Sequence, residues 1–271
     1  MQCCAAPFTQ WFDFARTGDI NQLKDMIEIC KNKIEARKAV NDEVFPGFSA
    51  IHYAAMFGHE QIVQELLPYE AGALTKQLTK IRAPGISSFA MFNLAPGSNC
   101  LMLALLSDQR QVVRVILDFI QQNPSAFTKM CVENEFRLTT FGAAACCRFA
   151  EAYEVLRDPV FQQELLTVLD GDFVPLQLAV QHFNLEFLEI FSKLLQNVEI
   201  AQTVFAVSSE GRNVIEICVL NSKAEKLGVT EQQRDQFLGR LKQLVGEAAK
   251  VKGVAIGEEF LKGKKIENWV T

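Results

Sequence analysis

The stretch from Gly47 to Leu67, GFSAIHYAAMFGHEQIVQELL, constrains the fold of this chain more than any other. Ser49 precedes a short apolar run, where its hydroxyl can accept a hydrogen bond from one of the unpaired amides that begin a helix. Gly58 ends that run, since glycine takes the left-handed helix cap without steric cost. From Ile62 onward apolar residues recur with the spacing of one helix face. The stretch therefore predicts two short antiparallel helices joined by a tight turn.

The order of residues in this stretch resembles the ankyrin-repeat family. The family pattern is G-x-T-P-L-H-x-A-A-x-x-G-H-x-x-x-V-x-x-L-L, and Ala50 stands where proline is usual. The positions that meet the pattern are Gly47, Ser49, Ile51, His52, Ala54, Ala55, Gly58, His59, Val63, Leu66 and Leu67. The resemblance implies an all-α, ankyrin-type solenoid of helix-turn-helix units, in which each helix pair buries its apolar face only against its neighbours.

Five further units keep the small-residue and apolar register of this stretch. If the helix-ending Gly58 is taken as the marker of a unit, its equivalents are Gly18, Asp108, Arg148, Phe183 and Ser222. Adjacent markers lie 35 to 50 residues apart, more than the family period of about 33 residues, which predicts irregular, lengthened loops. The predicted units lie near residues 10–40, 47–68, 97–124, 137–158, 171–196 and 211–246. We expect them to form one array over residues 1–249, followed by a short helical tail at residues 250–271.

Composition argues against several classes of protein. Hydrophobic residues make up 49% of the chain and charged residues 22%, values typical of a folded protein. The longest apolar runs, such as Cys100–Leu106, are far shorter than the roughly 20 residues of a membrane span, so no integral membrane segment is predicted. We also expect no secretory signal, because the N-terminus lacks a basic region followed by an apolar one. The net charge of −5 argues against nucleic acid as the partner, since phosphate contacts need a basic face.

The sequence offers little for catalysis or metal binding. The adjacent pairs Cys3-Cys4 and Cys146-Cys147 lack the C-x-x-C spacing that a zinc site prefers, so neither a metal nor a cofactor is expected. The phosphate-loop, dinucleotide, zinc-protease and serine-hydrolase motifs are absent from the sequence. One alternative is an enzyme-like protein in which Cys147 is the nucleophile and His182 its base. Adjacent inner helices stack at roughly 10 Å, whereas a hydrogen bond reaches about 3 Å, so a non-enzymatic role is favoured.

The resemblance implies a protein partner, because ankyrin proteins bind through a concave groove made of turn tips and the exposed ends of inner helices. By register, the candidate groove residues are Phe45, Phe48, Met56, Phe57, Leu106, Ser107, Cys147, Gln181 and His182. The N-terminal half of this set is apolar, and clustered exposed aromatic and Met side chains indicate an interface. The alternative is that the long segment 68–96, with Phe89, Met91 and Phe92, folds back and covers them.

Two further expectations concern the setting of the protein. The chain has repeats that depart from the family pattern and an interior rich in Phe. In both respects it resembles divergent ankyrin proteins of protists and the secreted ankyrin effectors of intracellular bacteria. Glu258 and Glu259, near the C-terminus, are similar to the acidic patch in translocation signals of such effectors. Either resemblance implies a eukaryotic cytosolic partner and a cytoplasmic place of action, reached by non-classical secretion into a host cell in the bacterial case. A self-associating scaffold is a lesser hypothesis.

Overall fold

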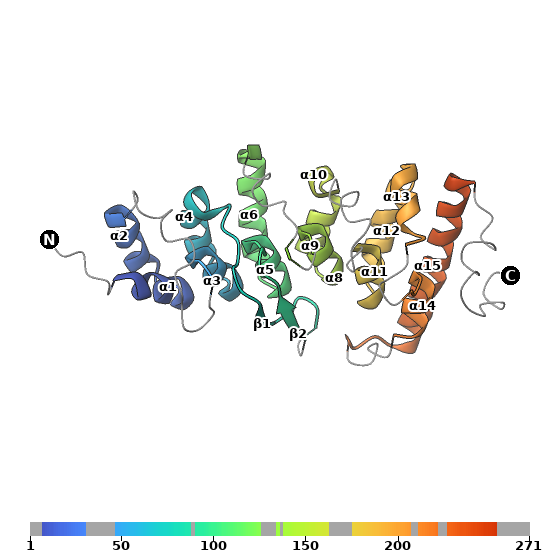
Figure 1. Cartoon of the computed structure of the whole chain (residues 1–271), viewed down its shortest axis with the longest axis horizontal. Coiled ribbons are helices and arrows are strands. Elements are labelled where there is room, and N and C mark those ends of the chain that lie inside the picture. Colours follow the sequence, from blue (N-terminus) through green and yellow to red (C-terminus); the bar gives the residue numbers. More distant parts are fainter. Residues whose placement is uncertain are drawn as a thin grey trace. The chain divides into compact units, whose positions relative to one another are not determined.

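The computed structural model describes residues 7–30, 47–87, 90–125, 134–135, 138–162, 175–206, 211–221 and 227–253 (Figure 1). The chain divides into two compact units, Met1–Ala144 and Ala145–Thr271, and the boundary falls inside helix α8 (Thr140–Cys146). A helix pair occupies each of the six predicted positions, so the predicted helical fold is confirmed. That all six pairs belong to one array stays a prediction.

The first unit stacks three helix pairs in two layers. Its helices are α1 (Pro7–Thr17), α2 (Ile20–Cys30), α3 (Ala50–Phe57), α4 (Glu60–Glu70), α5 (Cys100–Leu106) and α6 (Arg110–Gln122). Helices α1, α3 and α5 pack side by side in one layer, and α2, α4 and α6 do so in the other (Figure 1). The fully buried Ala54 and Ala55 keep α3 thin enough to contact a neighbouring helix on either side.

A β-hairpin lies in the segment between α4 and α5, which the sequence predicted to be irregular. Strand β1 (Thr79–Arg82) pairs antiparallel with β2 (Met91–Leu94), with Ile81 opposite Phe92. Ile81 and Leu94 are buried, whereas Lys80 is exposed. Such alternation is the signature of a strand with one face on a core. Eight residues of this predicted lengthened loop therefore form strands, within a fold that is otherwise helical as predicted.

The second unit contains the remaining helices. They are α9 (Ala150–Arg157), α10 (Pro159–Gln162), α11 (Pro175–Gln181), α12 (Leu185–Leu194), α13 (Val198–Thr203), α14 (Val214–Val219) and α15 (Glu231–Lys252). Helix α11 packs on α14, while α12 packs on both α9 and α15. Helix α15 is capped by Thr230, whose hydroxyl accepts a hydrogen bond from the Gln233 amide at 3.2 Å. Most of the predicted tail, residues 254–271, lies outside the described residues.

Phenylalanine side chains fill much of the interior of the second unit, as the sequence predicted. The rings of Phe187 and Phe191 stack with centroids 5.4 Å apart, and Phe183 meets Phe237 edge to face at 5.4 Å. All four are at least 95% buried. Aromatic pairs of this geometry add to the stabilisation that burial alone gives. The Phe183–Phe237 contact therefore holds the turn between α11 and α12 against α15.

Candidate functional site

Each helix pair of an array must reverse direction in a short turn, and a left-handed residue does this at four of the marker positions. The residues with positive φ are Gly18 at +84°, Gly58 at +81°, Asp108 at +57° and Phe183 at +52°. The amide of the following residue then donates to the carbonyl five residues back, as from His59 to Ala54 at 2.9 Å. This closure satisfies carbonyls that would be unpaired at the helix end. Arg148 departs from the pattern, since its φ is not positive, and Ser222 lies outside the described residues.

In the first unit, the side chain that follows the marker ties each turn to the preceding helix pair. His59 Nε2 donates to the carbonyl oxygen of Arg16 at 2.9 Å, since that oxygen can only accept. One pair later, Gln109 Nε2 donates to the Met56 carbonyl at 3.1 Å. We call these side chains turn rungs. Because each rung satisfies a carbonyl at the end of an inner helix, it fixes the stacking of one pair on the next.

The second unit has equivalent rungs with amide side chains. Asn184 Nδ2 donates to the carbonyls of Ala145 at 3.0 Å and Cys147 at 2.7 Å. Asn221, which directly precedes the marker position Ser222, makes a comparable contact, because its Nδ2 donates to the Gln181 carbonyl at 2.7 Å. The Asn184 side chain also accepts from the Phe187 amide, which caps α12. These contacts give Cys147 and Gln181 structural roles through their backbone carbonyls.

His52 forms its hydrogen bonds within its own repeat. Its Nδ1 accepts from the Ser49 amide at 3.0 Å, and its Nε2 donates to the Ala73 carbonyl at 3.2 Å. Complete burial lowers the pKa of His52 to about 4, so the ring is neutral at pH 7. The imidazole thus joins the start of α3 to the loop that leads into the next repeat.

Glu70 is a second buried polar residue of this repeat, and the sequence analysis did not single it out. Only 1% of its surface is exposed, and its carboxylate accepts from the Ile51 amide at 2.9 Å. A carboxylate at the start of α3 satisfies an unpaired amide and interacts favourably with the helix dipole. The one sequence signal was an acidic residue at the end of the apolar face of α4.

The apolar candidates of the near-consensus repeat divide into a buried and an exposed group. Phe48 is fully buried, with its ring centroid 5.5 Å from that of Tyr53, and Met56 is only 8% exposed. Phe57, at the end of α3, exposes 43% of its surface. Phe45 lies outside the described residues. In this repeat, Phe57 alone of the described candidates offers a large surface to a partner.

The next two candidates, Leu106 and Ser107, are covered by the segment that carries the hairpin. Both are at least 95% buried. The amide of Gly85 donates to the Leu106 carbonyl at 3.0 Å, and a Cβ on Gly85 would lie 2.1 Å from the Leu105 carbonyl oxygen. Glycine is required for this close approach. The segment between α4 and α5 therefore folds onto the end of α5. The alternative that segment 68–96 covers the apolar candidates of the N-terminal half stays a prediction, and Phe57 is exposed.

The candidates of the second unit are less accessible than the sequence suggested. Cys147 is fully buried, and Gln181 and His182 are only partly exposed. Burial also raises the pKa of the neighbouring Cys146 thiol to about 12. A cysteine nucleophile reacts as an exposed thiolate, so the surroundings of this pair favour a structural role. Nothing in the geometry supports the Cys147–His182 alternative.

Residues 14–128 match a family model described as ankyrin repeats (3 copies). This part of the chain therefore consists of ankyrin repeats. The matched range takes in the three helix pairs of the first unit from Phe14 in α1 onward. Ankyrin repeats are in general protein–protein interaction modules and typically non-enzymatic scaffolds. A comparison with curated proteins found no match.

The described residues also bear on metal sites and membrane spans. Among the described residues, no group of three or more His, Cys, Asp or Glu side chains is placed to hold a metal ion. Within the same residues, none of the helices combines the length and the apolar character that crossing a membrane requires. The binding role of the nine candidate residues stays a prediction, and exposure selects Phe57 among them.

Proposed function

We propose that this protein binds a partner protein and that Phe57 anchors the contact. The observation that carries the proposal is the exposure of this ring at the end of an inner helix, where the ankyrin resemblance places the binding groove. Phe48 and Met56, its apolar neighbours in sequence, are buried. Aromatic side chains supply a large share of the binding energy at protein interfaces, which supports Phe57 as the anchor.

The surroundings of Phe57 hold its backbone in place before a partner arrives. Gly58 closes the turn directly after it, and the Gln109 rung bonds to the Met56 carbonyl directly before it. Its ring centroid lies 6.5 Å from that of His59, which itself donates to the preceding helix pair. A preorganised anchor loses little conformational freedom on binding. Phe57 can therefore contribute most of its burial to affinity.

The test compares two charged substitutions in one repeat. Phe57→Glu places a charge in the proposed contact, and the matched control Tyr69→Glu places one on the end of α4, where Tyr69 is 38% exposed. Each variant is used to capture proteins from eukaryotic lysate, and the captured proteins are quantified by mass spectrometry. Met56 is left unchanged because it is nearly buried, and a charge there would disturb the fold.

We expect Phe57→Glu to remove proteins that the parent chain and Tyr69→Glu both capture. Loss of a hot-spot aromatic weakens binding by about 2 kcal/mol or more, roughly 30-fold. Circular dichroism must show equal helix content for both variants. Capture of the same proteins by Phe57→Glu at undiminished levels would exclude Phe57 as the anchor.

The setting of the partner is also a proposal, supported by the sequence alone. We infer a eukaryotic cytosolic protein, met in a host cell if the chain is a bacterial effector. Parallel capture from eukaryotic and bacterial lysates tests this, because Phe57-dependent capture should occur only from the eukaryotic one. Phe57-dependent capture from the bacterial lysate alone would contradict the inference.

A further inference from the structure

The segment between α4 and α5 differs in charge from the rest of the chain. Residues 71–99 contain Lys76, Lys80 and Arg82 but neither Asp nor Glu, in a protein whose net charge is −5. A local positive potential on an acidic protein attracts and orients anionic partners. The segment is also the longest departure from the repeat pattern, so the repeat fold itself does not explain its composition.

The hairpin in this segment places its cations and its exposed apolar side chains on the same face. Alternate residues of a strand point to the same side, so Lys80 and Arg82 share one face of β1. Leu78 directly precedes the strand and continues the same alternation. Met91 lies opposite Arg82 in the strand register, and Asn93 lies opposite Lys80. We call these five residues the hairpin face. Leu78 exposes 59% of its surface and Met91 52%.

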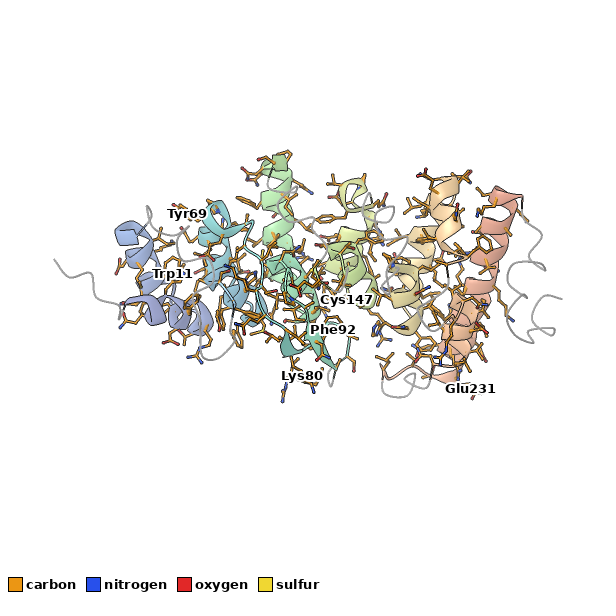
Figure 2. The ribbon with its side chains drawn as sticks, viewed as in Figure 1. Trp11, Tyr69, Lys80, Phe92, Cys147 and Glu231 are labelled. Carbon is orange, nitrogen blue, oxygen red and sulfur yellow. The ribbon has the colours of Figure 1, made fainter. Side chains whose placement is uncertain are left out.

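The opposite face of the hairpin is fixed on the core. Ile81 is 2% exposed and Leu94 is fully buried, and the turn is held on α5 by the hydrogen bond from Gly85 to Leu106. In Figure 2, Lys80 points away from the helices of its unit. Phe92 lies opposite Ile81 in the register and so belongs to the other face. Among the described residues, neither Lys80 nor Arg82 forms an ion pair. The hairpin face is thus a rigid, outward surface whose cations remain available.

We propose that the hairpin face binds an acidic peptide segment that also carries apolar side chains. Carboxylates of such a segment pair with Lys80 and Arg82, and its apolar side chains cover Leu78 and Met91. Methionine adapts its shape to different apolar partners, and the planar guanidinium of Arg82 can hold a carboxylate through two hydrogen bonds. This surface is separate from Phe57, and the inference does not depend on the proposed anchor.

A peptide fits the face better than a polyanion does. Nucleic-acid sites neutralise many phosphates with a broad basic surface, whereas this face carries two cations on a chain of pI 5.4. Two apolar side chains, each more than half exposed, would contact a phosphate backbone without benefit. A partner that carries both carboxylates and apolar groups can pair with Lys80 and Arg82 and also cover Leu78 and Met91.

Selection from a phage-displayed library of random peptides, with the full chain as bait, tests the proposal. We expect the selected peptides to be enriched in Asp and Glu together with Leu, Ile, Phe or Met. A synthetic copy of the most enriched peptide is then measured by fluorescence anisotropy. Charge reversal at both cations, Lys80→Glu with Arg82→Glu, should weaken its binding about tenfold or more, since each exposed pair is lost and replaced by repulsion.

Three further variants separate charge from apolar contact. Lys80→Arg with Arg82→Lys keeps the charge and should bind within about threefold of the parent. Leu78→Ser with Met91→Ser removes the apolar contacts and should weaken binding about fivefold or more. Lys193→Glu, on the exposed side of α12, is the control for net charge and should bind as the parent does.

Two outcomes would overturn the proposal. One is that the selected peptides show no acidic enrichment, or that the double charge reversal leaves their affinity unchanged. The other is that a single-stranded oligonucleotide, or vesicles containing phosphatidylserine, bind the parent but not the charge-reversed chain while no acidic peptide is selected. In that case the face would be an anion site for another class of partner. Equal thermal unfolding of all variants shows that the fold is unchanged.

Discussion

The repeat of α3 and α4 and the repeat of α11 and α12 reach the same geometry with different residues. The first is nearly consensus, with His52, Gly58 and His59 at its distinctive positions. By register, the second has Gln177, Phe183 and Asn184 there. Gln177 Nε2 donates to the Ala206 carbonyl at 3.2 Å, as His52 donates to a loop carbonyl of its own repeat. Each position of the motif therefore requires a hydrogen bond or a backbone conformation, and more than one type of residue can provide it.

The marker position differs most between the two repeats, because Gly58 of the near-consensus repeat is replaced by Phe183 in the divergent one. Gly58 takes its left-handed conformation without strain and leaves room for the Gln109 rung, because a Cβ there would lie 2.3 Å from the Gln109 side-chain oxygen. Phe183 takes a similar conformation, φ +52°, at a cost of about 1–2 kcal/mol for a residue with a Cβ. Its ring is 95% buried against Phe237. Burial of the ring offsets the backbone strain.

The largest effect should come from removing that ring. Phe183→Ala should lower the free energy of unfolding by about 3–4 kcal/mol, because it leaves a cavity and keeps the strain. Phe183→Gly should destabilise by about 1 kcal/mol less, because glycine relieves the left-handed conformation. Urea unfolding followed by circular dichroism measures both changes.

Phe187 in α12 supplies the matched pair of controls. It is 1% exposed and helical, so Phe187→Gly should be about 1 kcal/mol worse than Phe187→Ala, the usual order in a helix. If glycine is the worse substitution at both positions, strain at Phe183 is not the difference between the repeats.

Because Gln177 replaces His52 in the divergent repeat, this position should make stability depend on pH in the near-consensus repeat alone. The folded pKa of His52, about 4, lies below the unfolded value near 6.5, so the unfolded chain binds more protons between these values. Stability from this group is therefore present above about pH 6.5 and is lost as pH falls toward 4. The loss should reach about 2 kcal/mol at pH 5.

His52→Gln copies the divergent repeat and tests this directly. The variant should lose the part of the pH dependence that His52 supplies, about 2 kcal/mol between pH 8 and pH 5, measured by urea unfolding at each pH, while its amide keeps a donor for the Ala73 carbonyl. All other titratable groups are the same in both proteins, so the difference between them isolates His52. An unchanged pH dependence in the variant would place its origin elsewhere.

The smallest effect should come from adding a methyl group at the glycine marker. Gly58→Ala should destabilise by about 1–2 kcal/mol, through strain at positive φ and displacement of the Gln109 rung. Gly246→Ala in α15, where the added Cβ meets nothing within 4 Å, should instead stabilise by about 0.5–1 kcal/mol. Thermal unfolding of the two variants should shift in opposite directions, and a shift of the same sign would show that the turn does not require glycine.

The sequence predicted the helix pairs because their signals are local. Small residues, caps and apolar spacing locate α3 and α4 without any knowledge of distant contacts, and the marker at Phe183 follows from register. The hairpin was missed because its strands have four residues each and are separated by a Pro-Gly turn. The burial of Phe48 and Leu106 could not be predicted from the sequence either, because it depends on segments that pack over them from elsewhere in the chain.

The turn rungs all have one direction. In every case the donor belongs to the later helix pair and the acceptor carbonyl to the earlier one, as with His59 on Arg16 and Asn221 on Gln181. During synthesis a chain emerges from its N-terminus, so the acceptor is already in place when the donor leaves the ribosome. Each turn can then form its hydrogen bond to a helix pair that has already folded. Within each unit, the chain can therefore assemble in the order in which it is translated.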